Sequence, residues 1–256
     1  MENQKQKILD VLNKSGIKDA SFCNFLPLSP YLIDCRAKAR LPKNVSTVIS
    51  CIFPYKVKSL PPKNISRYSA VPDYHRVLSG YMSKATDNLR KEFPENKFEY
   101  FIDNSPIPEV LAACLAGLGV KGDNGLLITE KYGSFVFIGE IVTDIKIECE
   151  GTVKECIHCG KCSEACPKKD CIDCLSNVTQ KKGELEPFEI EAIKKYKTIW
   201  GCDICSEVCP LNKDKEYTYI KEFMTGYKDE YEKGEDISGR AFEWRGEKVI
   251  KRNFDL

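Results

Sequence analysis

The sequence predicts a mixed fold, α/β or α+β, in which a larger N-terminal domain precedes a smaller cysteine-rich domain. Strand-like and helix-like segments alternate before residue 150, and such an alternation is α/β in character. Most of the 14 cysteines fall between Cys149 and Cys209. With 256 residues, of which 42% are hydrophobic, the chain is long enough for one large domain or two modest ones. We therefore expect domains at 1–148 and 149–215, followed by a helical tail at 216–256.

The N-terminal domain is predicted element by element from its hydrophobic pattern. The first residues form a short amphipathic helix, and Gly16 stops it. Residues 46–53 and 133–143 are rich in β-branched and aromatic residues and predict buried strands. Between them, residues 73–93 predict a helix that faces a sheet, because its apolar residues recur at helical spacing. These are Val77, Leu78, Tyr81, Met82 and Leu89.

Residues 99–128 predict a strand, a turn, a helix, a glycine-rich loop and a second strand. Pro106 and Pro108 open the helix, which ends near Gly117. The scattered cysteines of this part of the chain are interpreted as core or surface thiols, since free cysteine packs as a small hydrophobe. They are Cys23, Cys35, Cys51 and Cys114.

The charge balance and the apolar pattern exclude several classes of protein. Lys and Arg total 39 against 38 for Asp and Glu, so net charge gives no general attraction to nucleic acid or to an anionic membrane. No stretch approaches the roughly 18 consecutive apolar residues of a membrane span. The N-terminus also lacks the apolar core of a signal peptide, and we expect a cytoplasmic protein. Only His75 and His158 are present, which argues against a His-rich catalytic zinc site.

Two cysteine runs, each closed by Cys-Pro, carry the strongest chemical signal in the sequence. Their spacing is that of bacterial ferredoxins, in which two [4Fe–4S] clusters take eight thiolates and the cysteine before proline binds the neighbouring cluster. The runs supply seven thiolates, and the eighth must come from between them, from Cys171 or Cys174. The runs are Cys156-x2-Cys159-x2-Cys162-x3-Cys166-Pro167 and Cys202-x2-Cys205-x3-Cys209-Pro210.

Cross-ligation predicts one cluster on the first three cysteines of the first run together with Cys209, and the other on Cys166, Cys202, Cys205 and the intermediate cysteine. Zinc is the alternative metal, because thiolates at this spacing also suit a tetrahedral site. The closing Cys-Pro pairs favour iron and sulfur, and such cluster pairs usually transfer electrons at low potential. His158 lies inside the first loop, where it is either exposed to solvent or tunes a cluster through a hydrogen bond, rather than binding metal itself.

Several blocks, in one order along the chain, resemble the epoxyqueuosine reductase family. The blocks are ISRYSAVPDYHRVL (65–78), YFIDNSPIPEVLAACLAGLGVKGDNGLLI (100–128), GSFVFIGEIVTD (133–144), the first cysteine run, CLSNVTQKKGEL (174–185) and GCDICSEVCPLN (201–212), with a weaker match in WRGEKVIKRN (244–253). The resemblance implies a nitroreductase-like α/β domain that binds cobalamin, followed by a ferredoxin-like domain with two [4Fe–4S] clusters. It also implies reductive removal of the epoxide oxygen of epoxyqueuosine in tRNA, as a step of queuosine biosynthesis.

The resemblance assigns roles to individual residues. The IDNSP block maps the proton donor onto Asp103, which the local sequence alone would place as a turn or cap residue. CLSNVT selects Cys174 as the intermediate ligand and leaves Cys149 and Cys171 spare. Position 78 is Leu where the cobalamin-ligand motif requires Gly, so we expect no cobalt ligand from His75. The residues expected near the corrin or the substrate are Arg67, Tyr68, Asp73, Tyr74, His75, Gly117, Gly119, Gly122, Asn124 and Gly125.

The chain also departs from the family pattern. Full-length members continue into a helical-repeat domain that helps hold tRNA, and too few residues follow Cys209 for a repeat array. We therefore expect a short member, in which Asp123-Asn124 stands where relatives tend to show Lys-Asn. A basic patch offers a contact for RNA, but solvated helix and loop faces are the favoured explanation of it. It comprises Lys168, Lys169, Lys181, Lys182, Lys194, Lys195 and Lys197.

Three functions fit these observations. The favoured one is a cobalamin-dependent reductase that acts on epoxyqueuosine in tRNA or on a smaller substrate, with an external donor of the flavodoxin or ferredoxin type. The second is a ferredoxin-type electron carrier without cobalamin, whose N-terminal domain docks a partner enzyme. The third is a structural cysteine–metal module. A buried acid and a cavity for a planar cofactor distinguish the first from the second, since a docking domain needs neither.

Overall fold

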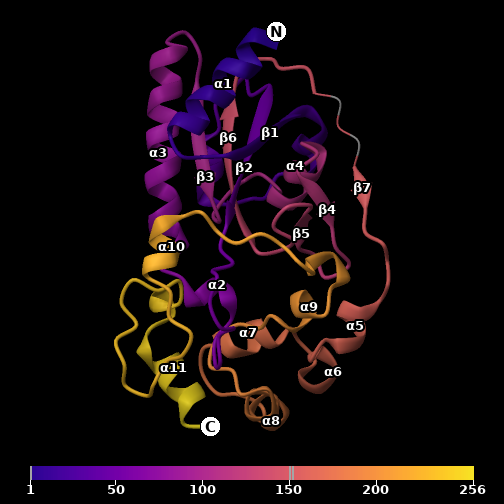
Figure 1. Cartoon of the computed structure of the whole chain (residues 1–256), viewed down its shortest axis with the longest axis vertical. Helices are drawn as coiled ribbons and strands as arrows, with labels where there is room; N and C mark the ends of the chain where they lie inside the picture. Colours follow the sequence, from indigo (N-terminus) through magenta and orange to yellow (C-terminus); the bar gives the residue numbers. More distant parts are fainter. Residues whose placement is uncertain (1, 150, 152) are drawn as a thin grey trace. The chain divides into compact units, whose positions relative to one another are not determined.

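The computed structural model describes residues 2–149, 151 and 153–256 and divides into two compact units (Figure 1). Unit 1 comprises Met1–Pro54 and His75–Ile157, and unit 2 comprises Tyr55–Tyr74 and His158–Leu256. The division differs from the expected domain boundaries in two ways. The segment Tyr55–Tyr74 belongs with the cysteine-rich part, and the C-terminal residues are part of that unit rather than a separate tail.

Unit 1 is built around a four-stranded sheet in the order β1-β2-β6-β3. All three strand pairs are antiparallel. An antiparallel sheet packed against helices makes unit 1 α+β rather than α/β. Three of the strands were expected, and β1 was missed because its polar sequence DASFCN has low strand propensity and pairs only at the edge. The strands are β1 (Asp19–Asn24), β2 (Thr47–Pro54), β3 (Phe98–Ile102) and β6 (Val136–Thr143).

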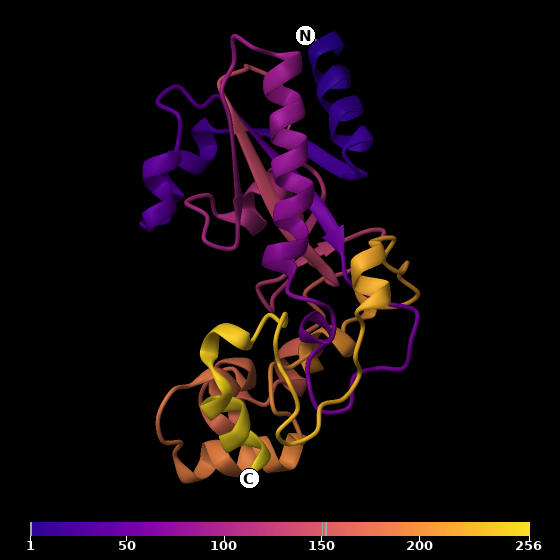
Figure 2. The ribbon, with the colours of Figure 1, turned by 90° about the vertical axis from the view of Figure 1, so that its left-hand side faces the viewer.

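Two long helices, α1 (Glu2–Lys14) and α3 (Tyr74–Glu92), cover one face of this sheet. The rings of Phe53 in β2 and Tyr81 in α3 meet edge to face with centroids 6.0 Å apart. Asn88 of α3 donates a hydrogen bond to the Ser15 hydroxyl at 3.1 Å, just after α1. Figure 2 shows α1 and α3 on one side of the strands and the segment of η1 and η2 on the other. Both helices were predicted by their apolar spacing.

The opposite face of the sheet carries α4 (Glu109–Leu115) and the 3-10 turns η1 (Leu26–Tyr31) and η2 (Arg36–Arg40). A buried cluster that includes Val48, Phe101, Ala112 and Val142 joins these elements to the strands. After α4 the chain forms a small second sheet in the order β5-β4-β7. Its strands are β4 (Gly119–Lys121), β5 (Leu127–Thr129) and β7 (Lys154–Glu155).

Unit 2 consists of short helices joined by loops. The longest is α8, which Glu186 and Glu189 stabilise with a capping box and Pro187 opens at its first position. Among the described residues no helix combines the length and the hydropathy of a transmembrane span. The helices are α2 (Arg67–Ala70), α5 (Lys161–Ala165), α6 (Lys168–Cys171), α7 (Leu175–Gln180), α8 (Pro187–Tyr196), α9 (Ile204–Glu207), η3 (Pro210–Asn212), α10 (Lys221–Thr225), η4 (Glu243–Arg245) and α11 (Glu247–Phe254).

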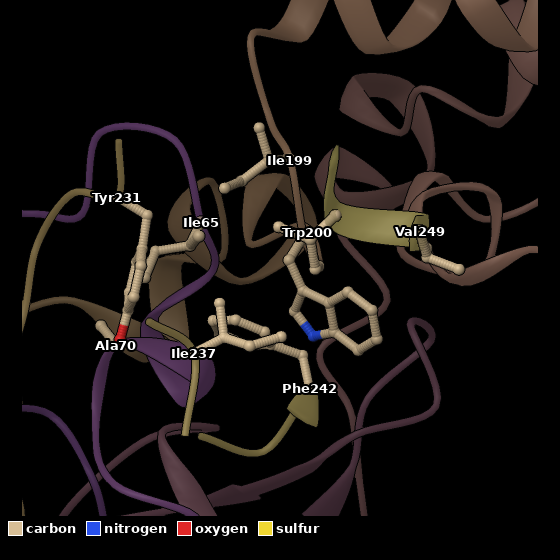
Figure 3. Packing of buried hydrophobic residues seen from close by; sticks show 9 residues of the cluster. Ile65, Ala70, Ile199, Trp200, Tyr231, Ile237, Phe242 and Val249 are labelled. Carbon is tan, nitrogen blue, oxygen red and sulfur yellow. The ribbon is translucent and has the colours of Figure 1, made fainter. Parts of the chain in front are cut away.

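Trp200 lies at the centre of a hydrophobic cluster of unit 2 (Figure 3). It is 1% exposed, and its ring packs on Phe242 with centroids 5.4 Å apart. Phe242 also meets Tyr231 edge to face. The cluster draws residues from before α2, from the segment ahead of Cys202 and from the last third of unit 2.

This cluster corrects the expectation of a helical tail at 216–256. Only α10 and α11 are α-helical there, because glycines at 226, 234, 239 and 246 interrupt the segment. The segment also contributes to the hydrophobic core, because Phe223, Tyr231 and Phe242 are buried. The apolar residues are spread between turns rather than placed at helical spacing, which is why the pattern looked polar in sequence.

Candidate functional site

Asp103 lies directly after β3, at a backbone φ of 57°, in the left-handed region that few residues other than glycine, asparagine and aspartate adopt readily. Its side chain is 60% exposed, and Oδ2 lies 3.3 Å from Nε2 of His75, at the start of α3. The two residues were both named from the sequence, and unit 1 brings them together. An exposed carboxyl beside an imidazole can exchange protons with solvent and with a bound substrate.

Two glutamates that sequence reasoning missed lie behind Asp103 in the same unit. Glu109 opens α4, and its carboxyl accepts a hydrogen bond from the backbone N–H of Asp103. Glu140 is in the middle of β6, fully buried, opposite Ser50 of β2 and Phe101 of β3. A charged residue inside the apolar stretch 133–143 was the signal that could have found Glu140.

The surroundings of this pair disfavour negative charge. Burial, followed by the charge of Asp103, raises the pKa of the Glu109 carboxyl from its ordinary 4.5 to about 8, against the opposing Asp103 N–H and His75. Burial and the neighbouring charge of Glu109 raise the pKa of Glu140 well above its usual range, although Ser105 opposes the shift. Both carboxyls therefore favour the protonated form near neutral pH.

The predicted glycine loop follows α4. Gly117 and Gly125 have φ of 76° and 83°, and a side chain at either position would meet no atom within 4 Å. Gly119 and Gly122 have a different role: a Cβ on Gly119 would lie 2.4 Å from the Ile128 carbonyl oxygen. Packing within the β4–β5 hairpin accounts for those two glycines. Asn124 accepts a hydrogen bond from the Leu126 N–H at 3.2 Å, while its buried Nδ2 has no partner.

The residues predicted ahead of α3 fall in unit 2, except His75. The backbone N–H of Arg67 donates to Oδ2 of Asp203 at 2.6 Å, and its Nε donates to Glu207 at 2.5 Å. Tyr68 accepts a hydrogen bond from the indole of Trp200 at 2.8 Å. These contacts fix Arg67 and Tyr68 beside the second cysteine run, where a cavity of about 300 Å³ borders both Arg67 and Cys202.

Asp73 and Tyr74 complete that block. The backbone N–H of Asp73 donates to the Gly239 carbonyl at 2.8 Å, and Tyr74 is the first residue of α3. Burial raises the pKa of Asp203 to about 6, which makes this acid a further buried carboxyl that the sequence pattern did not single out. Asp203 directly follows Cys202, in a stretch that was considered only for its cysteines.

Seven of the eight predicted cluster cysteines lie in unit 2, and Cys156 lies in unit 1. Helices α5 and α9, which carry Cys162 and Cys205, pack against each other. Burial raises the pKa of the Cys202 thiol to about 12, and the charges of Cys205 and Cys174 add to the shift. Cys174 and Cys205 therefore each lie within electrostatic reach of Cys202.

The described cysteines are all free thiols. The side chain of Cys171 lies outside the part of the structure that is described. The expectation that Cys171 binds no cluster therefore stays a prediction. Cys149 is half-buried, and its Sγ donates to the Ile147 carbonyl oxygen at 3.3 Å in unit 1. His158 has a φ of 50° in the loop of the first run.

Two of the basic residues between the runs are paired with carboxylates. Lys181 pairs with Glu189 at 2.9 Å, and Lys195 pairs with Asp170 at the same distance. Solvated and paired surface charge explains these two lysines.

Comparison with known proteins identifies the family to which this chain is similar. The family described as "Epoxyqueuosine reductase QueG, DUF1730" matches residues 36–104. The epoxyqueuosine reductase of Lactococcus garvieae is 31% identical over 240 residues, which cover 82% of this chain and 68% of that protein. The enzyme of Listeria monocytogenes is 30% identical over 233 residues, covering 80% and 61% of the two chains. The chain belongs to the epoxyqueuosine reductase family.

Solved structures agree with the assignment. The epoxyqueuosine reductase of Streptococcus thermophilus is 25% identical, with a TM-score of 0.81 that covers 98% of this chain and 80% of the other. A crystal structure of an epoxyqueuosine reductase with an epoxyqueuosine-modified tRNA-Tyr stem loop has the same TM-score at 23% identity, covering 99% and 80%. A catabolic reductive dehalogenase, at 13% identity and a TM-score of 0.51, shares the fold alone.

The family predicted from the sequence blocks is thus confirmed, and so is a mixed α and β architecture. The chain spans about three fifths to two thirds of the length of the first curated relatives that it matches. These relatives are enzymes by name, which favours an oxidoreductase over a carrier or a structural module.

Proposed function

We propose that this chain is an iron–sulfur, cobalamin-dependent oxidoreductase that removes the epoxide oxygen of epoxyqueuosine. The single observation that carries the proposal is Asp103, held in a left-handed conformation beside His75 in a member of this family. The co-structure of a relative with an epoxyqueuosine-modified tRNA stem loop supports tRNA as the substrate. The electron carrier without cobalamin is the weaker alternative, because a docking domain has no use for a proton donor.

Cysteine thiolates are the donors that a [4Fe–4S] cluster takes, and the runs of this chain supply them with ferredoxin spacing. One cluster would be held by Cys156, Cys159, Cys162 and Cys209, and the other by Cys166, Cys174, Cys202 and Cys205. The packing of α5 on α9 and the nearness of Cys174 and Cys205 to Cys202 support this arrangement. The cluster-binding part would then be a ferredoxin-like domain, and unit 1 a nitroreductase-like one.

Cobalamin would be held in part by the loop after α4. The orphaned amide nitrogen of Asn124 needs an acceptor, and Gly117 and Gly125 leave open space beside the backbone where a side chain would otherwise stand. These features fit a large polar cofactor. When bound, cobalamin supplies a strongly reducing metal centre for carbon–oxygen bond cleavage.

Asp103 would supply the proton that this chemistry needs. Reductive opening of an epoxide leaves negative charge on the oxygen, and a carboxylic acid within hydrogen-bond reach can protonate it. The left-handed conformation and the Glu109 contact hold the backbone of Asp103 in place, so its side chain starts from a fixed point on the surface of unit 1. His75 would keep its carboxyl oriented between turnovers. An external low-potential donor of the flavodoxin or ferredoxin class would provide the electrons.

Anaerobic reconstitution tests the proposal. Iron and sulfide are measured first, and cobalamin is then titrated while the cobalt spectrum is followed. We expect two clusters, a protein-bound corrin without a histidine ligand, and conversion of epoxyqueuosine to queuosine when a low-potential reductant is added. Two intact clusters without corrin binding would instead assign the chain to the electron carriers.

A further inference from the structure

The function proposed above uses Glu109 only to hold the backbone of Asp103, and it gives no role to Glu140 or to the protons of this buried carboxyl pair. Glu140 is fully buried, and neither of its carboxyl oxygens has a partner of good hydrogen-bond geometry, although the Ser105 hydroxyl lies close enough to oppose the rise in its pKa. Oε1 of Glu109 and the buried hydroxyl of Ser50 also have none. Four buried polar atoms without partners in one region are costly, because each loses its water without gaining a hydrogen bond. Buried polar groups without partners in a folded protein therefore call for an explanation, such as a catalytic role.

The sheet register explains how these groups meet. Ser50 and Phe101 are the residues opposite Glu140 on the two neighbouring strands, so the side chain of Glu140 rises on the face that α4 covers. Glu109, in the first turn of α4, reaches the same region and also accepts the Asp103 N–H. The pair therefore links the interior of the sheet to the loop that carries the exposed acid.

Among the described residues whose charges act on the pair, the one basic group is the imidazole of His75. Burial without a paired cation favours the neutral form of a carboxylic acid, and two adjacent carboxyls cannot both ionise cheaply. His75 is at the rim, where it contacts Asp103. The titratable groups in reach of the pair are Asp103, His75, and the buried thiols Cys23 and Cys51, whose pKa values burial raises and the charge of Glu140 raises further.

The reaction itself needs more protons than Asp103 holds. Removing an epoxide oxygen to give an alkene consumes two electrons and two protons and releases one water. The external reductant supplies the electrons, and Asp103 supplies one proton to the oxygen as the carbon–oxygen bond breaks. The second proton, which completes the water, must reach the same oxygen before that water leaves.

We propose that Glu109 and Glu140 form a buried proton store that returns a proton to Asp103 during each turnover. The proton passes from Glu109 to the Asp103 carboxylate, Glu140 shares its own proton with Glu109, and the pair is reprotonated from solvent through Asp103. The inference rests on the proposed function, because it assigns the second proton of that reaction. Glu109 and Glu140 are positioning and supply residues, since only Asp103 would contact the substrate.

The protonation state can be tested without any turnover. Infrared or carboxyl-carbon NMR spectra of protein labelled at glutamate should show a protonated carboxyl at pH 7 that Glu140→Gln removes. The control is Thr86→Val, which replaces another buried hydroxyl without a partner, on α3, and leaves every titratable group in place. Absence of a protonated glutamate at pH 7 overturns the proposal, whatever the enzyme does.

The supply role is tested by single turnover of the loaded enzyme. Glu109→Gln keeps an oxygen that can accept the Asp103 N–H but has no proton to give, and we expect a rate about 10–100-fold lower with unchanged substrate affinity. The pH dependence of the remaining rate should follow Asp103 alone, while Thr86→Val behaves as the parent. A Glu109→Gln variant with the parent rate and pH profile refutes the store. A parent enzyme that forms no queuosine refutes the proposed function and leaves the spectroscopic result standing.

Discussion

Asp103 owes its exposure and its constraint to local backbone geometry. At φ 57° the residue turns away from β3, and aspartate tolerates this conformation better than most residues other than glycine and asparagine. Glu109 then holds the turn through the backbone N–H rather than through the side chain, which stays available to a substrate. Backbone strain of this kind gathers at functional sites.

Replacing Asp103 by Asn should abolish turnover and leave cofactor loading intact. Asparagine has the same shape and also tolerates the left-handed region, but it has no proton to donate. We expect a loss of about 10²–10⁴-fold in the single-turnover rate, measured beside iron content and the corrin spectrum. An Asp103→Asn enzyme that turns over at the parent rate would exclude Asp103 as the donor.

Glu140 should make the protein less stable as pH rises. A carboxyl with a raised pKa binds its proton more tightly in the folded state, so the free energy of unfolding falls as pH climbs above the ordinary value of about 4.5. Each unit of that rise costs about 1.4 kcal/mol until the folded pKa is reached. The free energy of unfolding, measured in urea at pH 5 and at pH 8, should change less with pH in Glu140→Gln than in the parent. Equal pH effects in the two proteins would show that Glu140 is ionised in the folded state.

At the scale of elements, the β4–β5 hairpin depends on a glycine that the cofactor does not explain. A methyl group at Gly119 would be 2.4 Å from a backbone oxygen of β5, so Gly119→Ala should separate the strands and lower stability by about 1–3 kcal/mol. Gly80 is the matched control, because it lies inside α3 with nothing within 4 Å. Gly80→Ala should be neutral or stabilising by up to about 1 kcal/mol. Thermal unfolding of both variants distinguishes the cases, and equal melting temperatures would contradict the packing argument.

Trp200 should carry much of the stability of unit 2. Trp200→Ala removes the centre of the cluster in Figure 3 and is expected to cost about 3–5 kcal/mol. Trp244 is the control, since it is 60% exposed and stacks only on Arg245. Trp244→Ala should change the free energy of unfolding by less than about 1 kcal/mol. Similar losses in both variants, measured by urea unfolding, would mean that the cluster does not organise the unit.

The elements that could be predicted from the sequence are those whose buried residues recur at the regular spacing of a strand or a helix. Strands β2 and β6 and helix α3 bury their residues at strand or helical spacing, and their apolar patterns were sufficient. Strand β1 and the segment 216–256 were misjudged because their burial depends on partners distant in sequence. Asp19 of β1 pairs with Ile52, and Phe242 packs on Trp200. No local pattern contains that information.

At the scale of the whole molecule, some residues of the candidate site could be predicted from local sequence and others could not. Cluster ligands could be named from spacing because tight loops fix the geometry of thiolates, and Asp103 came from a resemblance to a family. Glu109 and Glu140 were missed because a first-turn glutamate normally faces solvent, and only the sheet register shows what Glu140 meets. The discontinuous units were unpredictable for the same reason, since Tyr55–Tyr74 joins the cysteine-rich unit through contacts such as Ser66 with Trp200.

Cys202→Ser should remove one cluster and with it all turnover. Serine is a poor ligand for iron, and the second run would retain too few thiolates to complete the cluster of Cys166, Cys174 and Cys205. We expect iron to fall to about half, with reductase activity lost. Cys114→Ser, in a buried thiol of unit 1 far from both runs in sequence, is the control and should keep full iron content. Unchanged iron in Cys202→Ser would refute the ligand assignment.

The central claim is that this chain reduces epoxyqueuosine, and a mass measurement tests it most directly. Cluster- and cobalamin-loaded protein is incubated anaerobically with a low-potential reductant and a tRNA stem loop that carries epoxyqueuosine, and the nucleosides are then analysed. We expect the modified nucleoside to lose one oxygen atom with the parent protein and none with Asp103→Asn. An unchanged nucleoside after incubation with fully loaded parent protein would contradict it.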